Sequence, residues 1–358
     1  MDSKIFALAL MLTYAFPIAP SVRANNAPKV ILVSTVNNPC PGAAFSRIQD
    51  AIDAASAGQT IEVCAGLYSE TPQIATSLSL KFDSGALLMP TSIHQSTVSL
   101  ATGSPIAAII TVRNALGVDI EGGVIDAGGS GISECAPNLM GIVYQNSSGT
   151  VKRSWVRNTQ LVSRLNGCQS GDGIFIQSGN GGTSQVTVTE NHVDGYQKNG
   201  ITANELGTQV EISLNTVVGA GPTTGAAQNG IQIGFGAQGT IKRNFVTSNI
   251  WSSCISTDQC VFFATGVLIE QSDEITVEDN SIGNSQVNIS SMVRASVAVS
   301  GDGTEIRKNT ITNAQIGILK SANVLSIDKN GNHFEDVDIP FVDPSPFLTT
   351  PGTTHPER

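Results

Sequence analysis

Five short stretches share one pattern that decides the fold: VTENHV (Val188–Val193), ISLNTV (Ile212–Val217), IKRNFV (Ile241–Val246), VEDNSI (Val277–Ile282) and IRKNTI (Ile306–Ile311). In each stretch an Asn stands three residues after one aliphatic residue and two residues before another. Apolar and polar residues alternate before the Asn, which predicts β-strands rather than helices. Ser154 takes the same place in VKRSWV, and Asn330 in IDKNGN keeps the first half of the pattern.

A small residue followed by an aliphatic residue recurs between these stretches, at Gly141-Ile142, Gly173-Ile174, Gly200-Ile201, Gly230-Ile231, Gly266-Val267, Ser296-Val297 and Gly317-Ile318. Self-similarity at intervals of roughly 20 to 40 residues is typical of stacked units. Units this short cannot bury a face alone, so their strands are expected to pair in parallel around one narrow core. We expect the Asn residues to sit at tight corners with left-handed backbone angles and to form an amide ladder; ligand binding is the alternative role.

The amino-terminal part of this pattern resembles a known superfamily. FSRIQDAIDAASAGQTIEVCAGLYSE (Phe45–Glu70) predicts a short capping helix over 45–55, a turn at Gly58 and a first strand, and DIEGGVIDAGGSG (Asp119–Gly131) is similar to an early coil of polygalacturonase-like proteins. With the repeat, these segments resemble the pectate-lyase-like right-handed parallel β-helix proteins over roughly residues 29–340. The resemblance implies an all-β solenoid with an amino-terminal cap. It implies no single reaction, because the superfamily contains lyases, hydrolases, epimerases, esterases and non-enzymes.

The ends of the chain predict an exported protein. Residues 1–24 have a positive start at Lys4, a short apolar run and a small-x-small cleavage site, which indicates a signal peptide. We therefore expect a secreted or periplasmic protein with the β-helix over 25–340 and a flexible tail over 341–358. The net charge is −10 and no basic patch is visible, which argues against nucleic acid as a partner. No later segment is apolar enough to predict membrane insertion.

Six cysteines in an exported chain favour disulfides. Fifteen pairings are open, and we expect the sequential one: Cys40–Cys64, Cys135–Cys168 and Cys254–Cys260. A metal site is the weaker alternative, because no CxxC occurs and His is scarce. We expect no cofactor, although Asp119, Glu121 and Asp126 leave Ca²⁺ open.

No reaction signature of the superfamily is complete. Glycoside hydrolysis needs carboxylates on both sides of the bond, and the chain offers one Asp in Gly171-Asp172-Gly173 where polygalacturonases carry a pair. The Asp and Arg motifs of pectin methylesterases and the Asp-Pro-His-type motif of epimerases are missing. No sequence signature in this chain marks an elimination of the pectate-lyase type, so that reaction stays open.

The repeat nevertheless predicts where a site would be. The connections 157–171, 194–199, 218–228, 247–264 and 283–294 should leave the stack on one side and form a wall. The residues that we expect near the chemistry are Asp172, Asp194, His192, Lys198 and Arg157, and those expected to bind substrate are Trp251, Tyr196, Asn199, Asn229 and Gln177. Each group has an alternative interpretation. The column at Asp172 would be a set of turn residues, and His192 and Asp194 would be a solvated pair. The aromatics of loop 247–264 would close the core under the loop.

These patterns predict a monomeric exported protein that binds or cleaves polysaccharide, as a lyase or hydrolase if it is an enzyme. The main alternative is a non-catalytic surface or periplasmic β-helix with a role in scaffolding, adhesion or maturation. A phage-type fibre, which would be trimeric, is the third.

Overall fold

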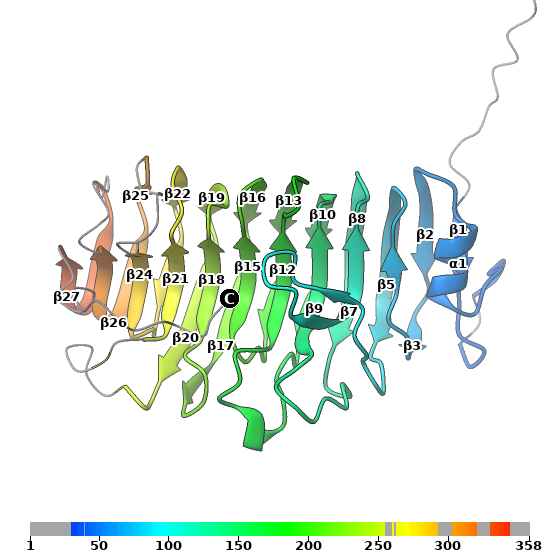
Figure 1. Cartoon of the computed structure of the whole chain (residues 1–358), viewed down its shortest axis with the longest axis horizontal. Coiled ribbons are helices and arrows are strands. Elements are labelled where there is room, and N and C mark those ends of the chain that lie inside the picture. Colours follow the sequence, from blue (N-terminus) through cyan, green and yellow to red (C-terminus); the bar gives the residue numbers. More distant parts are fainter. Residues whose placement is uncertain are drawn as a thin grey trace, which may run out of the picture.

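The computed structural model describes residues 30–38, 40–254, 260, 263–292, 303–320 and 330–343. The predicted signal peptide, the expected step at Ser296-Val297 and most of the predicted tail lie outside this range. Within it the chain is a right-handed parallel β-helix. Its strands stack side by side along one long axis and join in a continuous hydrogen-bonded sheet (Figure 1).

The sheet wraps around three faces, which we call A, B and C in the order in which each coil visits them. Four long strands turn a corner and serve two faces: β5 (Leu78–Leu88), β8 (Val118–Asp126), β26 (Thr310–Lys320) and β27 (His333–Val342). The first two lie on A and then B, and the last two on B and then C. Of the pairings that involve described strands, only that of β6 (Thr97–Val98) with β7 (Pro105–Arg113) is antiparallel.

The remaining strands each belong to one face. Face A holds β1 (Ile31–Val33), β2 (Gln59–Val63), β10 (Ser148–Lys152), β13 (Ser184–Thr189), β16 (Thr208–Ser213), β19 (Gln238–Lys242), β22 (Ile275–Glu278) and β25 (Glu305–Arg307). Face B holds β3 (Gly66–Tyr68), β11 (Trp155–Arg157), β14 (His192–Asp194), β17 (Thr216–Thr223), β20 (Phe245–Trp251) and β23 (Ser281–Gly283). Face C holds β4 (Gln73–Ile74), β7 (Pro105–Arg113), β9 (Asn138–Gln145), β12 (Asp172–Gln177), β15 (Asn199–Asn204), β18 (Asn229–Gly234), β21 (Thr265–Glu270) and β24 (Val287–Met292).

One continuous apolar core fills the stack. Each strand contributes its inward aliphatic side chains, such as Val188, Val193 and Ile174, all with no exposed surface. The glycine near the start of a face C strand is needed because the chain approaches this core closely there. A Cβ on Gly173 would lie 2.5 Å from Cγ1 of Val193, so a larger residue would displace the core.

The corner between faces A and B carries the predicted ladder. Nδ2 of Asn191 donates to Oδ1 of Asn215 at 2.9 Å, and Asn244, Asn280 and Asn309 continue the file at 2.9–3.0 Å. All five amides are buried. The prediction that these residues lie in single file is therefore confirmed.

Two details of the corner differ from the prediction. The left-handed residue is the one before each Asn, such as Glu190 at φ 58°, because the Asn side chain must face inward to reach its neighbours. The last rung is Asn332 and not Asn330, because Gly331 takes the left-handed position at φ 72° and Asn332 then bonds Asn309 at 3.0 Å.

The amino-terminal end is closed by the predicted helix, which is shorter than expected. Helix α1 spans Ile48–Ala54 and buries Ile48, Ala51 and Ile52 against the first coil. The carboxylate of Glu70 accepts hydrogen bonds from the backbone N–H groups of Ile48 and Gln49 at 2.7 and 3.0 Å, which satisfies two free donors of the first turn. The helix covers the core where the sheet would otherwise end.

The connections from face B to face C form the predicted wall, which hangs below the stack in Figure 1. The last of them is shorter than predicted, with three residues over 284–286, because β24 begins at Val287. Asn288 and Ile289 take the place of the expected Ser296-Val297 step, since Ile289 pairs with Val267 of β21. The structure also contains the three disulfides in the predicted sequential pairing.

Candidate functional site

The five residues expected near the chemistry lie at two separate places. Asp172 and Lys198 lie at the start of face C, the former in β12 and the latter just before β15. Arg157, His192 and Asp194 lie on the outer side of face B, on the adjacent strands β11 and β14. The expected set therefore divides into two groups, and each has its own geometry.

At face C the column of Asp172 forms a second polar ladder. Oδ1 of Asp172 accepts from the backbone N–H of Asn199 at 3.2 Å, Nδ2 of Asn229 donates to Oδ1 of Asn199 at 2.9 Å, and Thr265 donates to Oδ1 of Asn229 at 2.6 Å. All four side chains are buried. Neighbouring coils thus satisfy one another's polar groups here, which favours the structural interpretation of this column.

Asp172 is the titratable member of that ladder. Burial raises its pKa from an ordinary value of 3.8 to about 6, against the opposing charge of Lys198 and hydrogen bonds from Thr202 and Asn199. The ammonium of Lys198 donates to the backbone oxygen of Ala227 at 3.2 Å. A carboxyl group with this pKa can exchange a proton near neutral pH.

Two residues expected to bind substrate lie in buried positions. Tyr196 lies in the core with no exposed surface, and its hydroxyl donates to Oδ1 of Asn249 at 2.6 Å. Gln177 is 2% exposed and fixes the segment before β7, accepting from the backbone N–H of Leu100 at 2.9 Å and donating to Ser99 at 3.1 Å. Both side chains thus bond other parts of the stack.

The long connection that follows Trp251 is held by Gln286. Its amide bonds the backbone N–H and carbonyl of Trp251 at 3.2 and 3.0 Å. The indole of Trp251 is half-buried, and its Nε1 has no hydrogen-bond partner. Phe263 packs with Val287, and with Ile316 and Leu319, in a small apolar cluster outside the main core. At least this aromatic of loop 247–264 thus serves packing, as the alternative interpretation predicts.

Face B presents an exposed cluster in which aromatic and charged groups meet. The side chain of Asp194 accepts two hydrogen bonds at Oδ2, from Nε2 of His192 at 2.7 Å and from the indole Nε1 of Trp155 at 3.1 Å. The rings of Trp155 and His192 meet edge to face, with centroids 5.6 Å apart. Trp155 keeps 38% of its surface exposed. The indole is therefore fixed in orientation and open to solvent.

Arg157 completes this cluster on the other side of the indole. Its guanidinium carbon lies 4.3 Å from the centre of the Trp155 ring, and its Nε donates to Oδ2 of Asp126 at 2.7 Å. Burial would raise the pKa of Asp126, but hydrogen bonds from Asn158, Gly128 and Arg157, with the charge of Arg157, hold that pKa below its usual range. Asp126 therefore stays ionised and cannot act as a general acid at neutral pH. We call Asp126, Trp155, Arg157, His192 and Asp194 the Trp155 patch.

The patch continues along the axis of the stack. Trp155 pairs in register with His192, His192 with Thr216, and Thr216 with Phe245. Phe245 is 48% exposed. With adjacent strands about 4.8 Å apart, the two exposed aromatics are spaced by about 14 Å. The surface suits an extended ligand that lies parallel to the axis.

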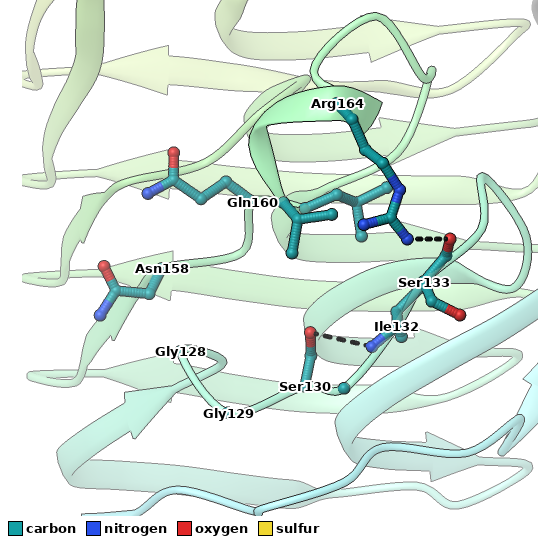
Figure 2. A pocket seen from close by; sticks show the side chains of 11 residues that line it. Gly128, Gly129, Ser130, Ile132, Ser133, Asn158, Gln160 and Arg164 are labelled. Carbon is teal, nitrogen blue, oxygen red and sulfur yellow. Dashed lines mark hydrogen bonds between the residues drawn. The ribbon is translucent and has the colours of Figure 1, made fainter.

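A cavity opens beyond the carboxyl end of β11, between two consecutive connections of the wall. It has a volume of about 520 Å³ and is lined by Gly128, Gly129, Ser130, Gly131, Ile132, Ser133, Asn158, Gln160, Leu161, Val162 and Arg164. We call it the loop pocket. Figure 2 shows Arg164 across the pocket from the glycine-rich segment, with its guanidinium bonded to the carbonyl of Ser133 at 3.1 Å.

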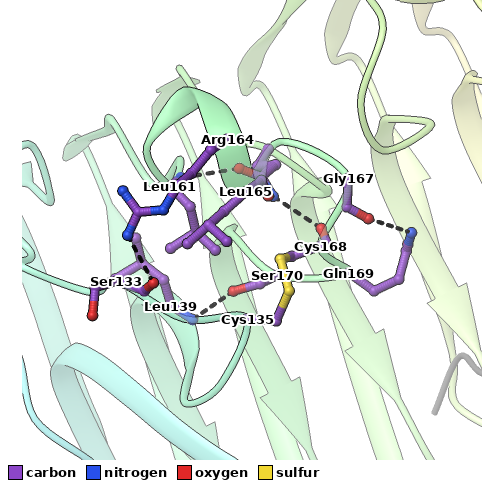
Figure 3. The surroundings of a disulfide bond; sticks show 11 residues. Ser133, Cys135, Leu139, Leu161, Arg164, Leu165, Gly167, Cys168, Gln169 and Ser170 are labelled. Atoms are coloured by element: carbon purple, nitrogen blue, oxygen red, sulfur yellow. Dashed lines mark hydrogen bonds between the residues drawn. A yellow bond between two sulfur atoms is a disulfide. The ribbon is translucent and has the colours of Figure 1, made fainter.

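The walls of the loop pocket are tied together from two sides. The Cys135–Cys168 disulfide joins the two connections (Figure 3). Oδ1 of Asp126 accepts from the backbone N–H of Gly128 and from Nδ2 of Asn158, both at 2.8 Å. Since Asn158 lines the pocket and Asp126 belongs to the Trp155 patch, the two features form one connected surface.

Metal ligation is not evident within the described residues. No group of three or more His, Cys, Asp or Glu side chains there converges in a way that could hold an ion. Two of the three expected oxygen donors pair with cations: Glu121 with Lys152 at 3.2 Å and with Arg153, and Asp126 with Arg157. In the part of the chain that the structure describes, no helix has the length and apolarity that would let it cross a membrane.

Trp155 and Asn158 are absent from the predicted set, and Asp126 entered it only as a Ca²⁺ ligand. The signal for Trp155 was present in the sequence, since it stands immediately before the inward Val156 in VKRSWV, as His192 does before Val193 in VTENHV. Asn158 had no such signal, because its role depends on a hydrogen bond to a side chain of the preceding coil.

A comparison with known protein families agrees with this architecture. A family model described as a right handed beta helix region matches residues 46–217. No curated protein matches the sequence. Similar solved structures include a surface adhesin of Streptococcus pneumoniae (15% identity, TM-score 0.43, 82% of this chain and 88% of that one) and an alginate lyase from Paenibacillus sp. (13%, 0.43, 86% and 99%). The Dettilon tailspike protein is also similar (13%, 0.40), and the match covers 79% of this chain and 56% of the tailspike. At these identities the likeness concerns the fold alone.

Proposed function

Because the chain is a right-handed parallel β-helix of the pectate-lyase-like fold, we propose that it is a secreted protein that binds polysaccharide along face B. The observation that carries this proposal is the exposed indole of Trp155, held by Asp194 and bordered by Arg157. A fixed aromatic ring offers apolar area at little cost in side-chain entropy, and the polar groups around it can bond hydroxyls. Phe245 extends this surface along the axis.

The same residues favour binding over cleavage on face B. Hydrolysis with two carboxylates needs one that is protonated at the working pH. Asp126 is held ionised by Arg157 and Asn158, and Asp194 uses one oxygen for both His192 and Trp155. These carboxylates fix their neighbours, so we assign face B to ligand recognition.

The test is a binding screen with the full secreted chain on pectin, alginate, other polyuronates and neutral polysaccharides. We expect Trp155→Ala to weaken binding of each polysaccharide that the wild type binds by about 10-fold or more, because the exposed ring on which a sugar stacks is lost. Affinity electrophoresis and titration calorimetry measure this. Phe245→Ala should have a smaller effect.

Leu206→Ala is the matched control, because Leu206 is an 81% exposed apolar residue beyond the end of β15, away from face B. Its affinity should stay within about 2-fold of the wild type. Unchanged affinity of Trp155→Ala, or no binding to any polysaccharide in the screen, would overturn the proposed function.

Cleavage at face C is a second candidate function. It is favoured by one observation, the buried carboxyl of Asp172 with a pKa of about 6 beside Lys198. We expect Asp172→Asn to remove any release of unsaturated products or reducing ends and to leave Trp155-dependent binding intact. Turnover that survives this substitution would exclude Asp172 from the chemistry.

A further inference from the structure

We infer that the loop pocket is a subsite for the carboxylate of an acidic sugar residue; this inference rests on the proposed function and narrows its substrate class. Of the pocket-lining residues, Arg164 alone carries a full charge. The neighbouring pair of Asp126 and Arg157 is neutral as a unit. A ligand in the pocket therefore meets one positive charge, on a protein whose net charge is −10.

The guanidinium of Arg164 is oriented but still has donors to offer. The contact that the described chain gives it is one hydrogen bond, from Nη2 to the carbonyl of Ser133 at 3.1 Å. A guanidinium has five N–H donors in a planar fork, which matches the two oxygens of a carboxylate. The side chain is exposed, so a ligand reaches it without displacing the core.

The pocket is large enough for a sugar ring and is built before the ligand arrives. Its volume of about 520 Å³ lies within the range of small-molecule sites. The glycine-rich wall is fixed to the preceding coil by a hydrogen bond from the N–H of Ile93 to the carbonyl of Ser130 at 2.8 Å. The Cys135–Cys168 disulfide and the hydrogen bonds to Asp126 fix the other walls. Few groups of the pocket therefore need to become ordered when a ligand binds.

The position of the pocket determines what kind of ligand it would serve. Asn158 forms part of its lining and also bonds Asp126, which bonds Arg157, which lies against Trp155. The pocket therefore lies to the side of Trp155, in the direction in which β11 runs toward the wall, and a sugar residue that leaves an axial chain on that side would reach Arg164. The pocket would then select chains that carry a carboxylate at that residue.

The experiment compares trigalacturonate, the same trimer with its carboxyl groups reduced to alcohols, and a sulfated galactose trimer, by titration calorimetry on the full secreted chain. We expect the wild type to bind the acidic trimer about 10-fold more tightly than the reduced one. Arg164→Gln should remove that preference, because it weakens binding of the acidic trimer far more than binding of the reduced trimer. Arg164→Lys should retain part of the preference for the acidic trimer, because lysine keeps the positive charge but lacks the planar guanidinium that matches both carboxylate oxygens.

Gln169→Ala is the matched control, because Gln169 is neutral and exposed and lies on the same connection as Arg164 but does not line the pocket. It should change each affinity by less than about 2-fold. Equal loss for the acidic and reduced trimers in Arg164→Gln, tighter binding of the sulfated trimer than of trigalacturonate, or wild-type binding of neutral sugars only, would each overturn the carboxylate subsite. All three results leave the binding role of Trp155 standing. Failure of every trimer and polysaccharide to bind would overturn both proposals.

Discussion

At the scale of single residues, the two buried carboxylates near the wall behave in opposite ways because their partners differ. Asp126 receives a guanidinium and two N–H donors, which lower its pKa. Asp172 receives hydrogen bonds from neutral groups. Burial raises its pKa to about 6, and the charge of Lys198 offsets only part of that rise. The first residue is therefore a fixed anion that organises the Trp155 patch and the loop pocket. The second is a proton-exchanging group on face C.

The raised pKa of Asp172 has a consequence for stability. In the folded chain Asp172 holds its proton up to about pH 6, whereas in the unfolded chain it loses the proton near 3.8. This difference in pKa between the folded and unfolded chains stabilises the fold. The stabilisation is fully present below about pH 4 and is lost as the pH rises through 6. We expect Asp172→Asn to gain about 2 kcal/mol relative to the wild type between pH 4 and pH 8. Urea unfolding at a series of pH values measures this; a difference that is independent of pH would contradict it.

At the scale of elements, the stack depends on contacts between coils more than within them. Each ladder Asn bonds the coil on both sides. Asn244 donates to Oδ1 of Asn280 and to the carbonyl of Ile212, and its own Oδ1 accepts from the amide of Asn215. Removing one rung leaves buried groups of the two neighbouring coils without partners.

Asn244→Ala should therefore cost about 3 kcal/mol in the free energy of unfolding, since each buried group left unsatisfied costs about 1–3 kcal/mol. Thr240→Ala is the control from the same coil, because Thr240 lies on the outer side of face A. It should cost well under 1 kcal/mol. Chemical denaturation followed by circular dichroism gives both values. A loss below 1 kcal/mol for Asn244→Ala would mean that the ladder does not hold the corner.

The disulfides differ in how much chain they constrain. Cys135 and Cys168 are separated by 33 residues, whereas Cys254 and Cys260 are separated by 6. On the loop-entropy scale these closures contribute about 4 and about 2 kcal/mol. We expect the Cys135→Ser/Cys168→Ser variant to unfold at lower denaturant concentration than Cys254→Ser/Cys260→Ser. The reverse order would show that the longer loop is already ordered in the unfolded chain.

The sequence predicted most of the elements because the signals for them are local. The Asn corners, the glycine steps and the helix at Ile48 are each visible within a few residues. The errors occur where a different residue can satisfy the same geometry. Asn288 replaces the step glycine because its amide turns inward to donate to the carbonyl of Thr312 at 2.9 Å, and no glycine marks that strand.

The candidate site was less predictable because it is made by neighbouring coils. Trp155 and Asp194 are 39 positions apart, and Asn158 and Asp126 are 32 apart. Which outward side chains meet depends on the register between coils, and the lengths of the intervening connections differ. His192 and Asp194 were predicted together because they share one strand.

At the scale of the whole molecule, net charge and local charge act in opposite directions on an acidic ligand. The chain carries −10, while the loop pocket presents Arg164. Long-range repulsion extends over about 30 Å at 0.01 M salt and about 8 Å at 0.15 M, whereas the contact with Arg164 acts at close range. The net negative charge of the molecule therefore slows the association of an acidic ligand, whereas the contact with Arg164 in the loop pocket slows its dissociation.

This separation predicts an unusual salt dependence for trigalacturonate. Between 0.01 M and 0.15 M salt we expect its association rate to rise about 3-fold, because the repulsion is screened, and its dissociation rate to change less. Stopped-flow measurement of the tryptophan fluorescence reports both rates, and loss of the signal in Trp155→Ala identifies its source. Arg164→Gln should speed dissociation and leave the rise in association rate in place, since that rise comes from the total charge. An association rate that falls with added salt would show that local positive charge governs the approach, and the proposed division between the whole molecule and the pocket would be wrong.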